Sequence, residues 1–368
     1  MSEPIEADRV EGAPHPRETP VLLGQEAAEA DFLSAHASGR LHHAWLLTGP
    51  RGVGKATLAW RIARFLLSEE PADGLFGAPE PPTSLDTSPD HPVAHRIAAL
   101  SEPRLKLIRR SWDAKKDALK TQITVEEARE LKAFFQMSAA DGGRRVAILD
   151  AADEMNVSAA NAVLKILEEP PQDATILLIS HQPSRLLPTI RSRCRELRLA
   201  PLSPPDMATA MAQAGATADH PERLSELAAG SVGEAIRLTN LGGLDLYASL
   251  TGLFQPRLDR LAAIKLTETM AGRANEPRYD LFLRLIHLFL ARTARTALNG
   301  PPGEAASGEA ELLARLAPAP YAARPWAELH DALGQRTRHG KAVNLDPAAL
   351  LLDTLLKIDQ TAAQLSAG

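Results

Sequence analysis

The amino-acid sequence predicts an α/β domain built on a parallel sheet, followed by a small helical lid and an all-helical C-terminal domain. Three observations support this prediction. Up to residue 200, short apolar runs alternate with segments of helical periodicity, which is typical of a parallel sheet covered by helices. One of these runs leads through a glycine-rich turn directly into a helix. Beyond Pro201, only helical patterns follow.

The composition favours a helix-rich, cytoplasmic protein. The chain has 368 residues, of which 45% are hydrophobic and 24% charged, and its formal net charge is −5. This negative charge disfavours a protein that binds nucleic acid strongly by itself. No apolar run is long enough to span a membrane. The single cysteine, Cys194, excludes a disulfide framework and a cysteine zinc site.

The first 18 residues are acidic and rich in proline, so we expect a disordered leader over residues 1–18. The α/β domain is then expected over residues 19–200. Its first elements are an amphipathic helix over residues 25–36, a buried strand over residues 44–48 and a helix over residues 55–67.

The turn between that strand and the second helix carries a phosphate-binding motif. Gly49, Gly52, Gly54 and Lys55 fit the pattern G-x-x-x-x-G-K, whose backbone N–H groups can surround an anion. The next position normally supplies a hydroxyl ligand to Mg²⁺, and here it is Ala56. Thr57 comes one residue later, which turns its side chain by roughly 100° on a helix. The loop is therefore either a weak site for ATP, ADP or phosphate, or a relic that only packs.

The remaining elements of the α/β domain follow from local signals. Thr124 and Glu127 form a capping box that opens a helix. The other expected segments are a loop over residues 71–92, strands over residues 146–149, 174–179 and 197–199, and a helix over residues 158–169 that ends at a pair of prolines. A basic stretch over residues 104–120 is either a solvated strand and loop or a contact for DNA or a partner.

The strand over residues 146–149 ends in an acidic residue with the spacing of a metal ligand. Asp150 is the candidate ligand, and its alternative role is to cap the next turn. In ATPases of this kind a glutamate follows and orients the attacking water, but here the position is Ala151. Glu154 could replace that base only from the outgoing turn. The sequence therefore predicts a nucleotide fold without turnover.

The rest of the chain is expected to be helical in two parts. Ser203 can cap the first helix of a lid over residues 201–242. An all-helical domain follows over residues 243–368, with an interruption at the Pro- and Gly-rich stretch 299–309.

Three separated segments resemble one family. They are LHHAWLLTGPRGVGK over residues 41–55, NAVLKILEEPP over residues 161–171 and LPTIRSRC over residues 187–194. Together they resemble the clamp-loader subunits of bacterial DNA polymerase III, which have the AAA+ fold. The resemblance implies that the C-terminal domain is an oligomerisation collar.

The resemblance also implies roles for particular residues. Arg193, in the motif with Ser192 and Cys194, would act as a trans arginine finger on the ATP of a neighbouring subunit. Active members carry an arginine in the lid where this chain has Gly233, a third lost contact. Some members carry a four-cysteine zinc module after the first helix of the motif, and residues 71–92 contain no cysteine. We therefore expect no metal and no required cofactor.

The resemblance further implies a place in an assembly. The expected partners are the gamma/tau and delta subunits, with the sliding clamp and primer-template DNA reached through the assembly. The chain would be grouped with DNA-directed DNA polymerase, a nucleotidyltransferase, only as a subunit of the whole enzyme. Two alternatives stay open. One is an active gamma/tau-type ATPase that uses Thr57 with Asp153 or Glu154, and the other is a phosphate-sensing or DNA-binding adaptor outside replication.

Overall fold

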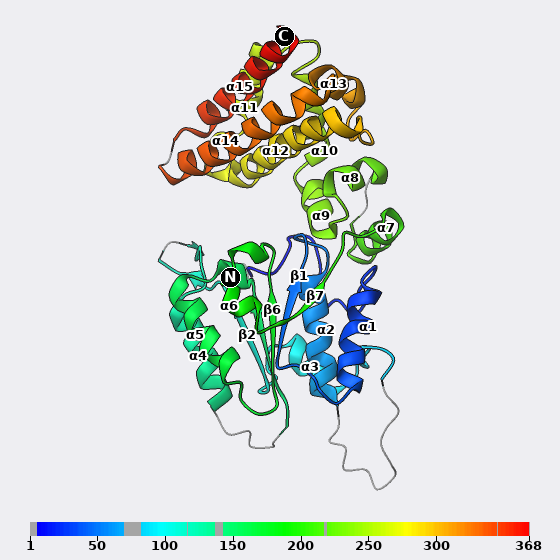
Figure 1. Ribbon diagram of the computed structural model, residues 1–368, viewed down its shortest axis with the longest axis vertical. Helices are drawn as coiled ribbons and strands as arrows, with labels where there is room; N and C mark the ends of the chain where they lie inside the picture. Colours follow the sequence, from blue (N-terminus) through cyan, green and yellow to red (C-terminus); the bar gives the residue numbers. More distant parts are fainter. Residues whose placement is uncertain are drawn as a thin grey trace. The chain divides into compact units, whose positions relative to one another are not determined.

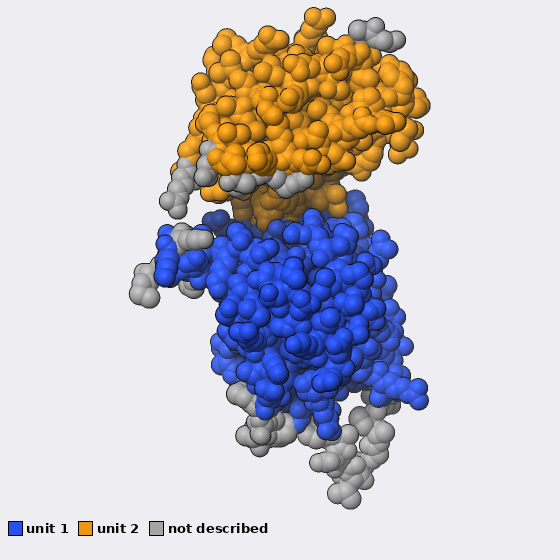
Figure 2. Space-filling model, turned by 60° about the vertical axis from the view of Figure 1, so that its left-hand side comes forward, with its two compact units in different colours: residues 1–215, 230–233 blue, residues 216–229, 234–368 orange. Residues whose placement is uncertain are grey.

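The computed structural model of the chain describes residues 6–69, 82–115, 117–136, 143–216, 219–343 and 345–367. It divides into two compact units, coloured separately in Figure 2. Unit 1 comprises residues 1–215 and 230–233, and unit 2 comprises residues 216–229 and 234–368. The expected lid over residues 201–242 is thus divided between the two units, and the three-domain division stays a prediction.

Unit 1 is built on a five-stranded sheet with the order β2-β5-β6-β1-β7 (Figure 1). All four neighbouring pairs are parallel. The carboxyl ends of the strands therefore lie at one edge of the sheet, which is where ligands bind in open α/β folds. The strands are β1 (Ala44–Thr48), β2 (Leu105–Arg109), β5 (Arg145–Asp150), β6 (Ala174–Ile179) and β7 (Arg195–Arg198).

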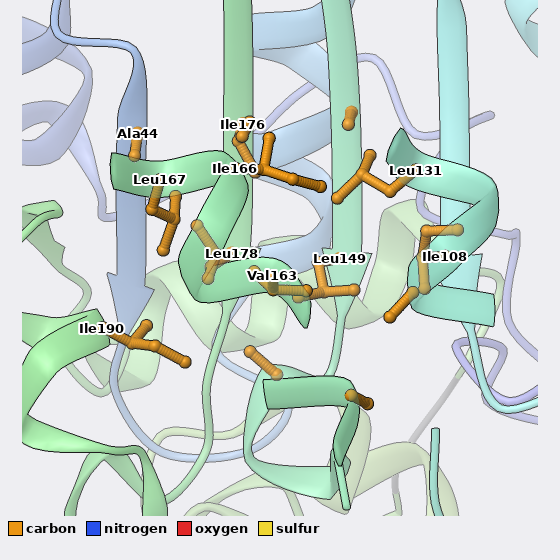
Figure 3. Close-up of a cluster of buried hydrophobic side chains, with 14 of the residues drawn as sticks. Ala44, Ile108, Leu131, Leu149, Val163, Ile166, Leu167, Ile176, Leu178 and Ile190 are labelled. Carbon is orange, nitrogen blue, oxygen red and sulfur yellow. The ribbon is translucent and has the colours of Figure 1, made fainter. Parts of the chain in front are cut away.

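The inner strands are buried on both faces, as their continuous apolar sequences predict. On one face, alternate residues of β1, β5 and β6 pack against α4 (Val125–Gln136) and α5 (Val157–Glu168). Figure 3 shows this layer, with Leu149 and Leu178 from the sheet beside Val163 from α5. The other helices of unit 1 are α1 (Glu26–Ala37), α2 (Lys55–Ser68), α3 (Pro92–Ala98), α6 (Pro188–Arg191) and α7 (Pro204–Gln213).

Most elements expected in the α/β domain are confirmed to within a few residues. The strands β1 and β6 have the expected bounds, and the expected helix over residues 55–67 is α2. The capping box is also present, because the N–H of Thr124 donates to Oε2 of Glu127 at 2.6 Å. The part of the expected loop over residues 71–92 that covers residues 71–81 lies outside the described residues.

The basic stretch over residues 104–120 supplies an edge strand of the sheet and a two-stranded ribbon, β3 (Trp112–Asp113) with β4 (Ala118–Leu119). Most of its cations that the structure describes are paired with carboxylates of the same chain. The pairs are Arg104–Glu102, Lys106–Glu130, Arg109–Asp8, Arg110–Glu154 and Lys120–Glu127. This pairing favours a solvated strand and loop over a contact for DNA.

Residues 6–18 differ from the disordered leader that composition predicts. Their contacts with the rest of unit 1 include the pair of Glu6 with Arg109 at 2.8 Å, and His15 is 1% exposed. The difference has a physical reason, because Arg109, about a hundred residues away, pairs with both Glu6 and Asp8 and so holds the segment against the sheet. Composition within the segment cannot reveal this pairing.

Unit 2 is helical, as expected. Its helices α12 and α13 are separated by residues 300–308, so the predicted interruption is confirmed. Arg292 of α12 is buried and donates to Glu309 at 2.7 Å, and Tyr247 donates to the same carboxylate at 2.5 Å. The helices are α8 (Pro221–Ala228), α9 (Val232–Asn240, whose first two residues belong to unit 1), α10 (Gly243–Gly252), α11 (Arg260–Glu268), α12 (Glu276–Asn299), α13 (Glu309–Leu316), α14 (Ala323–Ala342) and α15 (Pro347–Ala367).

In the part of the chain that the structure describes, no helix combines the length and the apolar character needed to cross a membrane.

Candidate functional site

The glycine-rich loop has the backbone that its sequence requires. It joins the end of β1 to the start of α2, and Gly49, Gly52 and Gly54 have φ of 139°, 81° and 101°. These positive values favour glycine. Side chains are excluded by packing as well, because a Cβ on Gly49 would collide with the carbonyl oxygen of Leu199 and one on Gly52 with Oγ of Ser231.

The lysine of the motif turns back onto its own loop. Nζ of Lys55 donates to the carbonyl oxygens of Gly49 at 2.8 Å and Pro50 at 2.5 Å, and the residue is 3% exposed. Burial lowers the pKa of Lys55 to about 8, although the nearby carboxylates of Asp150 and Asp153 oppose this shift. An anion in the loop would have to draw the ammonium group away from these carbonyls.

The two positions where the sequence analysis expects lost catalytic side chains lie at the start of α2 and directly after β5. Ala56 is the second residue of α2 and offers no oxygen to a metal ion. Ala151 follows β5 directly and is 4% exposed. Among the described residues, no group of three His, Cys, Asp or Glu side chains is arranged to hold a metal ion.

Asp150 ends β5 at the carboxyl edge of the sheet, as expected for the candidate metal ligand. Burial raises the pKa of Asp150 to about 7, and the nearby charges of Asp8 and Glu154 add to the rise. Lys55 and Arg51 act in the opposite direction. The sequence therefore predicted the position of this carboxyl group, but not the negative charges of Asp8 and Glu154 near it.

The alternative acids have other partners. Asp153 accepts the backbone N–H of His181 at 2.9 Å on one carboxylate oxygen and that of Gln182 at 3.2 Å on the other. Glu154 forms an ion pair with Arg110 at 2.5 Å. Asp153 therefore fastens the turn after β6, and each of the two acids interacts with a group of the same chain.

Sequence reasoning missed two groups at this edge, His181 and Asp8. Burial lowers the pKa of His181 to about 4, and the positive charges of Lys55 and Arg51 contribute to the shift. A signal for His181 existed, because it comes just after β6, the neighbour of β5 in the sheet. No local signal pointed to Asp8.

Residues 230–233 fasten the other side of the loop. Oγ of Ser231 donates to the carbonyl oxygen of Arg51 at 2.8 Å, and the N–H of Gly233 donates to that of Gly52 at 3.2 Å. Gly233 presents only backbone there, at the position where the resemblance implies an arginine in active relatives.

The arginine motif lies toward the opposite end of β1 from the loop. Arg195, two residues after Arg193, pairs in register with Trp45 near the start of β1, whereas Lys55 follows the end of that strand. The guanidinium of Arg193 donates to the carbonyl oxygen of Thr189 at 3.0 Å. It also pairs with Glu168 at 2.9 Å, and its side chain is 37% exposed. Arg193 thus does not face the loop of its own chain.

The neighbours of Arg193 hold the turn. Oγ of Ser192 donates to the carbonyl oxygen of Thr189 at 3.1 Å. Cys194 is half-buried and packs against the apolar layer between the sheet and α5. Burial raises the pKa of Cys194 to about 12, so its thiol is not a nucleophile at neutral pH.

Comparison with known proteins shows what the α/β region is similar to. Residues 24–203 match the family model described as "DNA polymerase III, delta subunit". The chain is 42% identical over 203 residues to DNA polymerase III subunit delta' of Pseudomonas aeruginosa, an alignment that covers 55% of this chain and 56% of the relative. It is 32% identical over 200 residues to subunit delta' of Bacillus subtilis, covering 54% of each chain. Over residues 24–203, the chain is therefore similar to the delta-prime subunits of DNA polymerase III.

This similarity agrees with the fold, and the predicted parallel-sheet α/β domain followed by helical parts is confirmed. That the sheet domain is of the AAA+ type stays a prediction. The chain spans about half the length of the two delta-prime relatives that it matches. Gamma/tau subunits are also similar, for example that of Mycobacterium bovis, which is 31% identical over 193 residues, covering 52% of this chain and 30% of the relative.

Proposed function

We propose that the chain is a non-catalytic clamp-loader subunit of DNA polymerase III that donates Arg193 to the nucleotide site of a neighbouring subunit. The observation that carries the proposal is that the arginine motif and the glycine-rich loop lie apart within unit 1. A partly exposed arginine lies toward one end of β1, and a loop without its catalytic side chains lies at the other.

Three features of the loop support the absence of turnover. Ala56 and Ala151 supply neither the metal ligand nor the base that phosphoryl transfer requires. Gly233 supplies no positive charge beside the phosphates. Lys55 donates to carbonyls of its own loop, so the lysine of the motif is directed inward.

The chemistry of Arg193 suits a role in trans. A guanidinium is charged at every physiological pH and its planar donors match phosphate oxygens, so it can neutralise charge that develops on a γ-phosphate. In GTPases such arginines accelerate hydrolysis by roughly 10³–10⁵-fold. In the free chain Arg193 pairs with Glu168, and a pair this exposed is weak enough to be exchanged for a phosphate.

The proposed setting is an assembly with gamma/tau and delta subunits in the cytoplasm. Through it, the subunit would help the ATP-driven loading of the sliding clamp onto primer-template DNA. No cofactor is required in this chain under the proposal, and nucleotide binding would be weak. Only the complete enzyme would carry the nucleotidyltransferase activity of DNA-directed DNA polymerase.

The test is the ATPase rate of the reconstituted assembly with clamp and primed DNA. We expect Arg193→Ala to lower this rate by at least tenfold, with Arg191→Ala as the matched control. Arg191 is an exposed arginine of the same turn, so its loss removes the same charge without removing the finger. If the assembly with Arg193→Ala hydrolyses ATP as fast as the assembly with Arg191→Ala, only a scaffolding role remains for the chain.

The alternative is an active ATPase of gamma/tau type, and the similarity to gamma/tau subunits favours it. It would need Asp153 or Glu154 as base, and both carboxylates have partners within the chain. We expect the purified chain alone to hydrolyse ATP no faster than a Lys55→Ala variant. A Lys55-dependent rate from the lone chain would favour the alternative.

A further inference from the structure

We propose that residues 6–18 form a strap that closes the nucleotide loop from within the chain, so that the protein's own side chains occupy space that a bound nucleotide would need. The proposal takes from the proposed function only that the loop is a former nucleotide site.

The strap is anchored over the carboxyl edge of the sheet by ion pairs. Asp8 pairs with Arg109 and, at 3.2 Å, with His15, and its side chain is 1% exposed. Glu6 pairs with Arg109 at 2.8 Å and with Arg17 at 2.9 Å. Arg109 lies opposite Asp150 in the register of β2 with β5, so these pairs hold the strap beside the former metal ligand.

From this anchor the chain continues to the loop. Cγ2 of Val10 lies 3.5 Å from the position that a Cβ on Gly233 would occupy, and the N–H of Gly233 in turn contacts Gly52 of the loop. Just beyond the strap, Cδ1 of Leu22 lies 2.5 Å from the Cβ position of Gly54, directly before α2. Val10 of the strap therefore lies beside a residue that contacts the loop, and Leu22 lies beside the loop itself.

The far end of the strap is fixed to α2. The ring of His15 lies edge-on to that of Trp60 with centroids 6.1 Å apart. Arg64 donates to the carbonyl oxygen of Arg17 at 2.7 Å and to that of Thr19 at 3.1 Å. The strap thus has attachments at both of its ends (Figure 1, dark blue).

The burial of the loop agrees with closure by the chain itself. Lys55 is 3% exposed and Asp150 is 8% exposed, although both are residue types that contact ligand in a working phosphate site. Asp8 is close enough for its charge to raise the pKa of Asp150. A carboxylate in this place also repels phosphate oxygens, so the strap opposes a nucleotide by charge as well as by volume.

Closure predicts a measurable change in affinity. If the strap is closed in about 99% of molecules, the apparent affinity for nucleotide is reduced roughly a hundredfold. Loosening the anchors by Glu6→Ala with Asp8→Ala should restore part of this factor. Glu18→Ala is the matched control, because it removes a carboxylate of the same strap whose side chain is 49% exposed.

The experiment titrates a fluorescent ADP analogue, in the presence of Mg²⁺, against the purified full-length chain. We expect the Glu6→Ala/Asp8→Ala variant to bind at least tenfold more tightly than wild type and Glu18→Ala. Adding Lys55→Ala to the double variant should abolish the gain, which assigns the binding to the loop. Equal affinity of wild type and the double variant would overturn the proposal.

A second measurement does not depend on how the variants fold. In hydrogen exchange of the wild-type chain, we expect protection of the N–H groups of Ala13 and Glu18, which donate to Val10 and His15 within the strap. Exchange of residues 6–18 at the rate of a free peptide would overturn the proposal. Neither result bears on Arg193, because that role is tested by the ATPase rate of the assembly.

Discussion

Glu127 gives the sharpest stability prediction, because one buried carboxylate joins three elements of unit 1. Its Oε1 accepts from Ser111 at 2.5 Å and from Lys120 at 3.0 Å, and its Oε2 accepts from the N–H and the hydroxyl of Thr124. Burial by itself raises the pKa of Glu127, but these hydrogen bonds outweigh it and lower the pKa from 4.5 to about 2.

The size of the effect follows from linkage. Lowering the pKa from 4.5 to about 2 corresponds to about 3 kcal/mol of folding free energy at neutral pH. Because the folded-state pKa is lowered, this contribution is fully present above pH 4.5 and is lost as the pH falls through 2. Glu127→Gln keeps one carbonyl oxygen but turns an NH₂ group toward donors, so we expect it to destabilise unit 1 by about 2–3 kcal/mol at pH 7.

Urea unfolding followed by tryptophan fluorescence measures this loss, since Trp45, Trp60 and Trp112 all belong to unit 1. The difference between wild type and Glu127→Gln should be large at pH 7 and less than half as large at pH 3. Glu126→Gln is the control, because Glu126 is the exposed neighbour on the same helix. If both variants unfold at the same urea concentration at pH 7, the hydrogen bonds of Glu127 do not stabilise the fold and the reasoning is refuted.

Three further predictions concern the loop and the arginine motif. Burial and like charges raise the pKa of Asp150 from 3.8 to about 7, so its charged form costs stability increasingly as the pH rises through this window. Asp150→Asn should therefore raise the urea midpoint at pH 8 more than at pH 5, and a lower midpoint at pH 8 would contradict this. The pKa of Cys194 is raised to about 12, so its thiol should react with a disulfide reagent at pH 8 about 10²–10³ times more slowly than free cysteine. A rate near that of free cysteine would show that the pKa of this thiol is not raised. Ala56→Ser with Ala151→Glu should not create robust ATPase activity, since Gly233 still supplies no cation, and full turnover by this double variant would disprove our account of the loss.

The parts of the fold that sequence predicted well are those with strong local signals. The strands β1 and β6 are continuous apolar runs, and their bounds were predicted without error. The strand β2 was treated only as part of a basic stretch, because Lys106 and Arg109 interrupt its apolar pattern. As an edge strand it needs burial on fewer sides, so its sequence carries a weaker signal.

The candidate site likewise has parts that the sequence predicted and parts that it did not. The loop, Asp150 and the lost positions follow from spacing along the chain. The position of Asp8 does not, because its partner Arg109 is 101 residues away and nothing near Asp8 specifies that partner. The sequence also did not predict that Lys55 turns back onto its own loop, since a motif defines the residue type but not the hydrogen bonds of its side chain.

The inward lysine has a consequence for how this subunit depends on the metabolic state of the cell. A protein whose folded form binds a ligand is stabilised by mass action, so its stability rises and falls with the ligand concentration. Here the ammonium group of Lys55 is satisfied by the carbonyls of Gly49 and Pro50 without any ligand. Because these hydrogen bonds already stabilise the loop, we expect the melting temperature of the chain to change little whether ATP is abundant or exhausted.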